Sequence, residues 1–570
     1  MSGEFRPLWR IVFKNFINSF RVGKIAFSGK SIGKDYLGNS YHEIAANPGA
    51  GKRKPTRWYT PPKGQDFEQP IPSEWEAWLR LRRDNAPTEE EVATNMAIAQ
   101  MKKENAAKIE VRRLAEGGSL PTAPKKGPES FPKYEGIYAS NDKLDTKGFS
   151  FLFFFLFFSN CAFISMENMT SKEIFELEDK YGCHNYAPLP VALCRGKGVY
   201  LWDVEGKRYY DFLSAYSAVN QGHCHPRIIA ALKEQADKLT LTSRAFHSDQ
   251  LGKYEKFMTE LLGFDRLLPM NTGVEGGETA CKLARKWGYE VKKIPENKAK
   301  IIFAKNNFWG RTMAAVSSST DPEAYGNYGP FMPGFEIVPY DDIPALEKEL
   351  KDPNVAAFMV EPIQGEAGVI VPKDGYLKKV RELCTKYNVL FIADEVQTGL
   401  GRTGKLLAVN HEGVKPDIVI LGKALSGGVM PVSAVLASDS VMKVMRPGTH
   451  GSTFGGNPLA CAVATAAMKV LIDENLCDNA VKMGDLLRNE LEKIPDSQVT
   501  AVRGRGLMCA IDVNKNIPAY EVCKRMKDAG LLAKTTKGQT IRLAPPLVIT
   551  KEQVLEGAAI IRKVLDSFSK

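Results

Sequence analysis

The sequence predicts an α/β protein whose larger part combines a large domain, built on a mostly parallel sheet, with a small α+β domain. A small, partly disordered amino-terminal module precedes both. The first observation behind this prediction is that apolar runs of strand length alternate with amphipathic helical stretches over the carboxy-terminal two thirds of the chain. The second is length, because 570 residues exceed the size at which one hydrophobic core keeps growing.

Three continuous apolar runs predict buried strands at residues 356–363, 389–396 and 417–422. The second run follows a stretch in which Leu377, Val380, Leu383 and Cys384 share one helical face. A strand, a helix and a further strand in this order indicate a β-α-β unit. The sheet should therefore be parallel and covered by helices on both faces.

The first 138 residues have a different character. Residues 1–25 alternate basic and apolar positions with only Glu4 as an acidic residue, which is typical of a transit peptide and equally of an amphipathic first helix. Residues 34–72 are turn-rich and short-stranded, and residues 88–114 follow a charged helical pattern. Residues 116–132 are polar and rich in Pro, Gly and Ser, which indicates a linker.

The run from Phe149 to Ile164 consists almost entirely of Phe and Leu. It is shorter than the roughly 20 residues that a membrane-spanning helix needs. Composition changes abruptly on both sides of it, and Met166 follows. We interpret this run, within a linker over residues 139–165, as translated non-coding sequence that joins two reading frames.

Composition narrows the functional classes. The net charge of +11 is concentrated in the first 148 residues, where a solvated basic face accounts for it better than a nucleic-acid surface does, so no nucleic-acid partner is predicted. All ten cysteines lie from Cys161 onward, irregularly spaced and without a C-x-x-C pair, so the spacing suggests neither a zinc site nor a disulfide framework. A reducing compartment is expected.

Two motifs that resemble ligand sites are discounted. The tract from Gly222 to Pro226 (GHCHP) contains adjacent possible metal ligands, but neighbours on one strand cannot all reach one ion, so a structural loop is expected and no metal site is predicted. Residues 28–31 (SGKS) resemble a phosphate-binding loop, yet the first glycine of that motif falls on Lys24.

Asp394 and Lys423 are the residues that point most directly to chemistry. Each stands where an apolar parallel strand ends, which is where open α/β sheets bind their ligands. A buried lysine is costly unless it is used, because burial disfavours its charge. Pyridoxal phosphate uses such a pair, with the amine as a Schiff-base partner and the carboxylate beside the pyridine nitrogen. A strand-end ion pair is the alternative that two residues alone leave open.

Two glycine-rich loops add to this pair. Residues 271–280 (NTGVEGGETA) lead into a predicted helix, and a glycine-rich turn at a helix start offers free N–H groups to an anion such as the cofactor phosphate. Residues 451–458 (GSTFGGNP) form a second loop of the same kind.

From about Met166 to Lys570 the chain resembles the class III aminotransferases of fold type I, and within them the ornithine aminotransferases. The run from Phe391 to Gly428, FIADEVQTGLGRTGKLLAVNHEGVKPDIVILGKALSGG, carries the class signature. The resemblance implies a large cofactor domain at about 220–460 and a small domain built from 166–219 and 461–570.

The resemblance also implies the roles of individual residues around the cofactor. Lys423 would carry pyridoxal phosphate and move the proton of the reaction, and Asp394 would pair with the pyridine nitrogen. The other cofactor contacts would come from Gln397 at the ring hydroxyl, Phe308 on the ring face, Gly273 and Val274 at the phosphate, and Ser452 and Thr453 from the partner subunit. A homodimer or higher homo-oligomer is implied by the last pair.

For the substrates, the resemblance implies L-ornithine and a 2-oxo acid, 2-oxoglutarate. Tyr186 and Tyr216 would shape the pocket around the amino-acid end of ornithine, and Arg311 would hold a carboxylate. Glu366 would pair with Arg542 while ornithine reacts and would release it for the oxo acid. The alternatives within the class are acetylornithine and 4-aminobutyrate.

Residues 1–138 resemble the mitochondrial complex I accessory subunits of the A12 type and the related assembly factor mimitin. The resemblance rests on residues 33–43 (GKDYLGNSYHE), 57–59 (RWY) and 71–79 (IPSEWEAWL). It implies a binding module with complex I components as partners. A non-enzymatic assembly protein is therefore the competing hypothesis for the whole chain, although the retained Lys423 and Asp394 favour an enzyme. The region after Met166 lacks a transit peptide, so a cytosolic location is expected, with mitochondria as the alternative that the module supports.

Overall fold

The computed structural model describes residues 30–46, 55–62, 71–88, 90–94 and 169–568. The chain divides into two compact units, Met1–Leu152 and Phe153–Lys570. The amphipathic start at 1–25, the linker at 116–132 and the Phe-rich run at 149–164 lie outside the described residues. Within the described parts, no helix is long and apolar enough to cross a membrane.

The first unit contains a small antiparallel sheet and a short helix. Its elements are β1 (Lys30–Lys34), β2 (Ser40–Ile44), β3 (Thr56–Thr60) and α2 (Ser73–Leu79), with strand order β1-β2-β3. Of the predicted charged helix at 88–114, the structure describes residues 88 and 90–94, and 90–94 are helical.

Three aromatic side chains form the core of this unit. Tyr41, Trp75 and Trp78 are each no more than 2% exposed, and the rings of Tyr41 and Trp75 stack at 3.9 Å between centroids. The Tyr41 hydroxyl donates a hydrogen bond to Asp35 Oδ2 at 2.9 Å, so its polar end is also satisfied. The aromatic residues of the 71–79 motif are therefore core residues.

The second unit is built around a seven-stranded sheet with the order β7-β13-β12-β11-β10-β8-β9. Only β13 runs antiparallel to its neighbours, so the sheet is mostly parallel, as predicted. The strands are β7 (Arg266–Met270), β8 (Lys300–Ala304), β9 (Phe335–Val338), β10 (Val355–Val360), β11 (Leu390–Asp394), β12 (Ile418–Leu421) and β13 (Ser433–Ala437).

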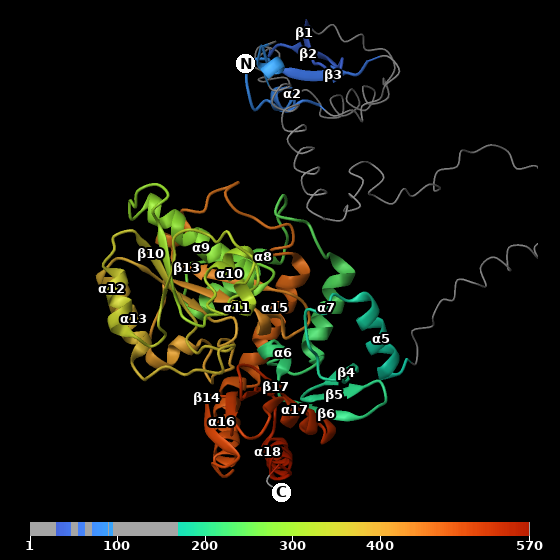
Figure 1. The fold of residues 1–570 in the computed structure, drawn as a ribbon, viewed down its shortest axis with the longest axis vertical. Helices are drawn as coiled ribbons and strands as arrows, with labels where there is room; N and C mark the ends of the chain where they lie inside the picture. Colours follow the sequence, from blue (N-terminus) through green and yellow to red (C-terminus); the bar gives the residue numbers. More distant parts are fainter. Residues whose placement is uncertain (1–29, 47–54, 63–70, 89, 95–168, 569–570) are drawn as a thin grey trace, which may run out of the picture. The chain divides into compact units, whose positions relative to one another are not determined.

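Helices cover both faces of this sheet (Figure 1). Successive residues of β10 alternate between two core clusters: Phe358 packs on the side of α13 (Tyr376–Lys386), and Met359 packs on the side of α9 (Gly273–Glu290). The elements that surround the sheet are α6 (Ser214–Ser217), α7 (Pro226–Lys238), α8 (Leu251–Leu262), α9 (Gly273–Glu290), α10 (Met313–Ser317), α11 (Pro322–Tyr325), α12 (Ile343–Leu350), α13 (Tyr376–Lys386), η3 (Ala408–Glu412), η4 (Lys423–Ser426), α14 (Asp439–Met442) and α15 (Pro458–Asp473).

Two smaller sheets come from the beginning and the end of the second unit. One has the order β16-β6-β5-β4 and the other β14-β15-β18-β17. Their elements and the neighbouring helices are α5 (Ser171–Tyr181), β4 (Leu193–Lys197), β5 (Tyr200–Asp203), β6 (Arg208–Asp211), α16 (Leu476–Leu491), β14 (Val499–Arg505), β15 (Met508–Val513), α17 (Ala519–Asp528), β16 (Leu531–Leu532), β17 (Lys534–Thr535), β18 (Thr540–Leu543) and α18 (Lys551–Asp566). The pairing of β16 with β6 joins segments that lie far apart in the sequence.

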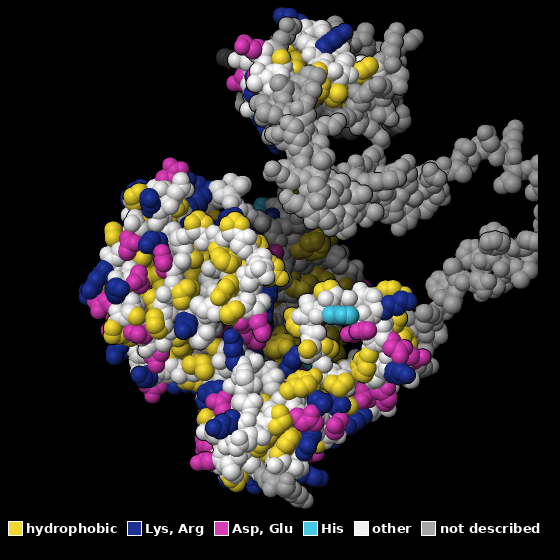
Figure 2. Space-filling model, in the orientation of Figure 1, with side chains coloured by type: hydrophobic (Ala, Val, Ile, Leu, Met, Phe, Trp, Pro, Cys, Tyr) yellow, Lys and Arg dark blue, Asp and Glu magenta, His cyan; other side chains and the backbone are white. Residues whose placement is uncertain are grey.

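The surface of the second unit carries both signs of charge. On the face shown in Figure 2, basic and acidic side chains are interspersed and not gathered into a patch of one sign. This distribution is typical of a solvated surface.

We expect the substitution Trp75→Ala to unfold the first unit, because loss of a buried Trp costs about 3–5 kcal/mol and a small unit has little stability to spare. Hydrogen exchange of the full chain, followed by mass spectrometry, would show β2 losing protection while β10 and β11 keep theirs. Tyr36→Ala is the matched control, since that ring is 46% exposed. Undiminished protection of β2 in the Trp75→Ala protein would contradict the assignment of Trp75 to the core.

Candidate active site

The carboxyl ends of three neighbouring strands bring Glu361, Asp394 and Lys423 to one edge of the sheet. Val360 of β10 is paired with Ala393 of β11, and Asp394 is paired with Ile420 of β12, so the residues that follow these pairs emerge together. They line a cavity of about 210 Å³ whose wall consists of Gly273, Val274, Phe308, Trp309, Gly310, Glu361, Asp394, Val396, Gln397 and Lys423.

Lys423 begins η4, one residue after the end of β12, and has a left-handed backbone, with φ of +44°. A non-glycine residue in this conformation costs roughly 1–2 kcal/mol, so the surrounding structure must hold it there. Burial lowers the pKa of the Lys423 amine to about 8, and the nearby Asp394 carboxylate opposes this shift.

Burial acts in the opposite direction on the two carboxyl groups of the cavity. It raises the pKa of Asp394 to about 6, against a hydrogen bond from the Val396 N–H at 3.1 Å and the charge of Lys423. It raises the pKa of Glu361 to about 8, an effect that the Asp394 charge strengthens. The Glu361 oxygens accept from the N–H groups of Phe308 at 3.0 Å and Gly365 at 3.1 Å. At neutral pH the cavity therefore holds one ionised carboxylate, on Asp394.

The floor of the cavity is the first turn of α9. Thr272 caps this helix through a reciprocal arrangement with Glu275, and Gly273 is its first residue. A Cβ on Gly273 would approach Val396 Cγ1 to 2.8 Å, so the close packing of helix and strand end requires glycine here. A helix start with free N–H groups at a cavity suits an anion such as a phosphate.

Arg542, on β18, forms an ion pair with Glu366 beside the cavity, and this Glu366–Arg542 pair is called the gate below. Its guanidinium is 2% exposed and donates from Nη2 to Glu366 Oε2 at 2.9 Å and from Nη1 to Gln397 Oε1 at 3.2 Å. Its Nε is buried and has no hydrogen-bond partner within the described part of the chain. The predicted pairing of Glu366 with Arg542 is thus present in the structure, and Gln397 extends it to the cavity wall.

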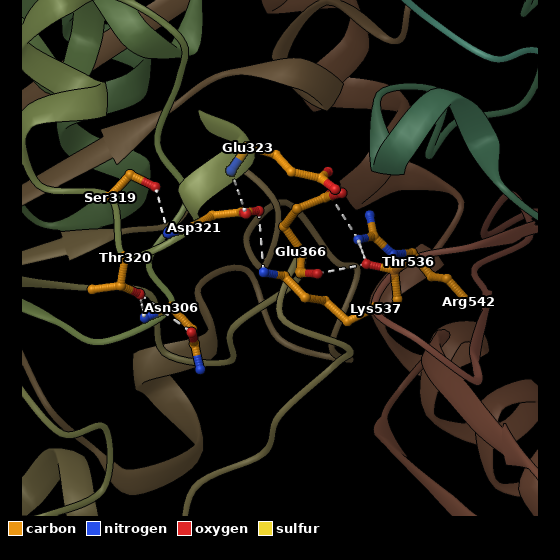
Figure 3. A network of polar contacts seen from close by, with 9 residues as sticks. All are labelled: Asn306, Ser319, Thr320, Asp321, Glu323, Glu366, Thr536, Lys537 and Arg542. Atoms are coloured by element: carbon orange, nitrogen blue, oxygen red, sulfur yellow. Dashed lines mark hydrogen bonds and ion pairs between the residues drawn. The ribbon is translucent and has the colours of Figure 1, made fainter. Parts of the chain in front are cut away.

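The turn between β17 and β18 is tied to loops of the parallel sheet at two points (Figure 3). The Thr536 hydroxyl donates to the carbonyl oxygen of Glu366 at 2.5 Å, and Lys537 Nζ donates to Asp321 Oδ2 at 3.1 Å. Figure 3 shows Glu366 reaching toward Arg542 and Thr536, while Lys537 reaches away toward Asp321. These bonds hold the strand that carries Arg542 against the edge of the large sheet.

Tyr216 lies beside this gate on an unusual backbone. The Arg542 Cζ atom is 5.6 Å from the centroid of the Tyr216 ring, and burial followed by the Glu366 charge raises the pKa of the Tyr216 hydroxyl. All four residues of α6, Ser214–Ser217, have positive φ although none is glycine, at a cost of roughly 1–2 kcal/mol each.

The remaining predicted substrate residues lie at the surface of the single chain. Tyr186 is 73% exposed and lies close enough to Tyr216 to contribute to the raised pKa of the Tyr216 hydroxyl. Arg311 is exposed, with its Cζ 5.4 Å from the centroid of the Phe308 ring.

Ser452 and Thr453 do not line the cavity of their own chain. The Ser452 hydroxyl accepts from Asn271 Nδ2 at 2.9 Å, just before the start of α9, and Thr453 is exposed. Within one subunit these residues therefore stand near the helix start but outside the cavity.

Sequence reasoning missed Glu361, Trp309, Gly310 and Val396 among the residues of the cavity wall. Glu361 could have been found, because it directly follows a strand that runs parallel to the one ending in Asp394. The discounted GHCHP tract forms separate pairs: His223 Nε2 lies 2.7 Å from Asp211 Oδ2, and His225 Nε2 lies 3.1 Å from Glu474 Oε1.

Comparison with known proteins gives two family matches. Residues 181–565 match the aminotransferase class-III family, and residues 29–115 match the family of NADH ubiquinone oxidoreductase subunit NDUFA12. The second match confirms the resemblance seen in the amino-terminal motifs.

Individual relatives agree with the first match. The chain is 69% identical over 395 residues to the mitochondrial ornithine aminotransferase of Drosophila melanogaster, covering 69% of this chain and 92% of the relative. It is 65% identical over 401 residues to the mitochondrial ornithine aminotransferase of Rattus norvegicus, covering 70% and 91%. The crystal structure of ornithine aminotransferase from Toxoplasma gondii ME49 superposes with a TM-score of 0.69 at 54% identity, covering 71% of this chain and 96% of that one.

The predicted cytosolic location is wrong. Both curated relatives named above are mitochondrial proteins, which points to mitochondria. The prediction relied on the residues that follow Met166, although residues 1–25 also fitted a transit peptide and mitochondria had been kept as the alternative.

The lysine, the carboxylate and the helix start meet in one cavity, and both the family match and the identity to relatives extend over about two thirds of the chain. The chain belongs to the class III aminotransferases.

Proposed function

We propose that this chain transfers the δ-amino group of L-ornithine to 2-oxoglutarate, giving glutamate 5-semialdehyde and glutamate, with pyridoxal phosphate as its cofactor. The observation that carries the proposal is the cavity in which Lys423, Asp394 and the start of α9 meet, with the Glu366–Arg542 pair joined to its wall through Gln397. The relatives named ornithine aminotransferase support the choice of substrate.

The residues of the cavity fit this cofactor. When bound, pyridoxal phosphate supplies an electron sink for the electrons of the C–H bond beside the reacting amine. Lys423 would hold its aldehyde carbon and Asp394 its pyridine nitrogen. Gln397 would contact the ring hydroxyl and Phe308 the ring face, and Gly273 and Val274 would bind the phosphate at the start of α9.

Proton transfer falls to Lys423. A pKa near 8 lies close to physiological pH, so the amine can take up and release a proton with little cost. Asp394 supplies negative charge, whereas Glu361 holds a proton at neutral pH and adds none. Because their surroundings give Asp394 and Glu361 different pKa values, the two carboxyl groups can have different roles in the reaction.

The gate would let one pocket accept two substrates. Ornithine carries a positively charged α-amino group, and the ion pair with Glu366 offsets the Arg542 charge that would otherwise repel it. 2-Oxoglutarate brings an additional carboxylate, which Arg542 would hold once Glu366 lets go. Arg542 Nε has no partner among the described residues and is available for this contact. Tyr186 and Tyr216 would border the amino-acid end of ornithine, and Arg311 would hold the other carboxylate.

The assembly and the domain limits form part of the proposal. Ser452 and Thr453 would complete the phosphate site of the partner subunit in a homodimer. Residues 166–570 would form the aminotransferase and residues 139–165 the linker. Residues 1–138 would form a binding module for mitochondrial complex I components, as expected for the family that residues 29–115 match.

The test uses the purified full-length chain and the absorption of its bound cofactor. We expect L-ornithine to shift the absorption band and 2-oxoglutarate to restore it, with glutamate 5-semialdehyde released in the first step. Lys423→Ala is the control that keeps the cavity but loses the amine. A loaded protein that responds to N-acetylornithine or 4-aminobutyrate in preference to ornithine would overturn the substrate assignment.

The two carboxyl groups of the cavity should respond differently to loss of charge. Glu361→Gln replaces a neutral acid with a neutral amide, so kcat at pH 7 should fall by less than about 10-fold. Asp394→Asn removes the one ionised carboxylate, and kcat should fall by about 100-fold or more. Cofactor content, measured by absorbance, serves as the control. Equal losses in the two variants would contradict the order of the two pKa values.

Glu366→Gln should release Arg542 from its ion pair. An interaction of this kind contributes about 1–2 kcal/mol, which corresponds to roughly 5–30-fold in a binding constant. We therefore expect KM for 2-oxoglutarate to fall and KM for ornithine to rise, because the freed cation repels the α-amino group. Steady-state kinetics with each substrate varied in turn would measure both changes, and equal effects on the two would argue against a gate.

A further inference from the structure

The left-handed turn that presents Tyr216 must be held by its surroundings. Ser214, Ala215, Tyr216 and Ser217 have φ of +49°, +46°, +59° and +70°. Left-handed backbone is unfavourable for side chains with a Cβ, and four such residues in succession cannot persist without compensating bonds.

The Asp211 side chain supplies compensating hydrogen bonds at the start of the turn. This residue ends β6 and is 3% exposed, and its Oδ1 accepts hydrogen bonds from the N–H groups of Leu213 and Ser214, both at 2.8 Å. His223 Nε2 donates to the other oxygen, Oδ2, at 2.7 Å. The carboxylate thus caps the backbone on one side and is fixed by an imidazole on the other.

Asn220 anchors the end of the turn in the same manner. Its Oδ1 accepts from Arg402 Nη2 at 2.6 Å, and its Nδ2 donates to the carbonyl oxygen of Leu400 at 2.8 Å. Arg402 in turn donates to the carbonyl oxygens of Leu507 and Pro545. The segment from Asp211 to Asn220 is therefore fixed at both ends while its middle is strained.

The middle of the segment faces the gate. Tyr216 lies against Arg542, at 5.6 Å from Cζ to the ring centroid, and next to Glu366. Ala215, its neighbour in the turn, is exposed. A change in the turn would therefore displace Tyr216 relative to the two gate residues.

We propose that Asp211 and His223 are positioning residues that set the preference for ornithine by holding the left-handed turn and, through it, Tyr216 at the Glu366–Arg542 gate. This proposal rests on the proposed function, since it concerns the substrate pocket of the same reaction. It assigns the His223 of the GHCHP tract a role in specificity, without contact to substrate.

The test compares variants of the full-length, cofactor-loaded protein. His223→Ala removes the donor to Asp211, and His223→Gln restores an N–H at the position of Nε2. We expect His223→Ala to lower the ratio of kcat/KM for ornithine to that for 4-aminobutyrate by about 10-fold, with the cofactor absorption unchanged, and we expect His223→Gln to recover most of the ratio.

Ala215→Gly provides a second, independent rescue. Glycine adopts left-handed backbone without penalty, so this change should relieve the backbone strain that the bonds of Asp211 and His223 otherwise offset. Added to His223→Ala, it should restore the ratio, and alone it should leave the ratio at the wild-type value. A His223→Ala effect that Ala215→Gly leaves untouched would overturn the proposal, because a general structural defect is not corrected by glycine at an exposed position.

Hydrogen exchange of the peptide that spans residues 212–221 separates this proposal from the proposed function. Faster exchange of this peptide in His223→Ala than in the wild type is expected whichever amine is the substrate. Unchanged exchange would contradict the proposal that Asp211 and His223 hold the turn. A wild-type protein that does not turn over ornithine would instead overturn the proposed function and, with it, the assigned preference.

Discussion

The structure depends on keeping a lysine amine and a carboxylate at the edge of a buried sheet. Burial disfavours the charged form of both Lys423 and Asp394. Their mutual attraction limits both pKa shifts, and a hydrogen bond from the Val396 N–H limits that of Asp394 further. A parallel sheet makes this arrangement possible, because the carboxyl ends of β11 and β12 lie side by side. Two layers of helices then exclude water from both faces, as the alternating core residues of β10 illustrate.

Much of this site could be predicted from the sequence because its residues obey local rules. Asp394 and Lys423 end apolar runs, and Gly273 begins a capped helix, so strand ends and a helix start were enough to place them. Glu361 obeys the same rule and could have been added. The Glu366–Arg542 pair could not, because it joins a loop after β10 to β18 of another sheet, and only the family resemblance connected them.

Other features lay beyond sequence reasoning for physical reasons. No glycine marks the left-handed turn at 214–217, and the side chains of Asp211 and Asn220, which form hydrogen bonds at its two ends, lie outside the turn. The pairing of β16 with β6 joins residues about 320 positions apart, for which no local pattern exists. Ser452 illustrates a third limit, because its hydroxyl accepts a hydrogen bond from Asn271 in its own chain, and no pattern within one chain indicates a contact with the cofactor of a partner subunit.

The gate also shows why its moving part must be Glu366. Arg542 is 2% exposed and bonded to Gln397, Gly365 and Thr536 as well as to Glu366, whereas the Glu366 side chain is 34% exposed. Moving the arginine would break several bonds, while moving the glutamate breaks one side-chain bond among the described residues and places its carboxylate in water. Gln397 must also be neutral. A carboxylate at this position would form a permanent ion pair with Arg542, and the oxo acid could not replace it. An amide at this position keeps Arg542 aligned with the cavity wall but leaves its charge for the substrate.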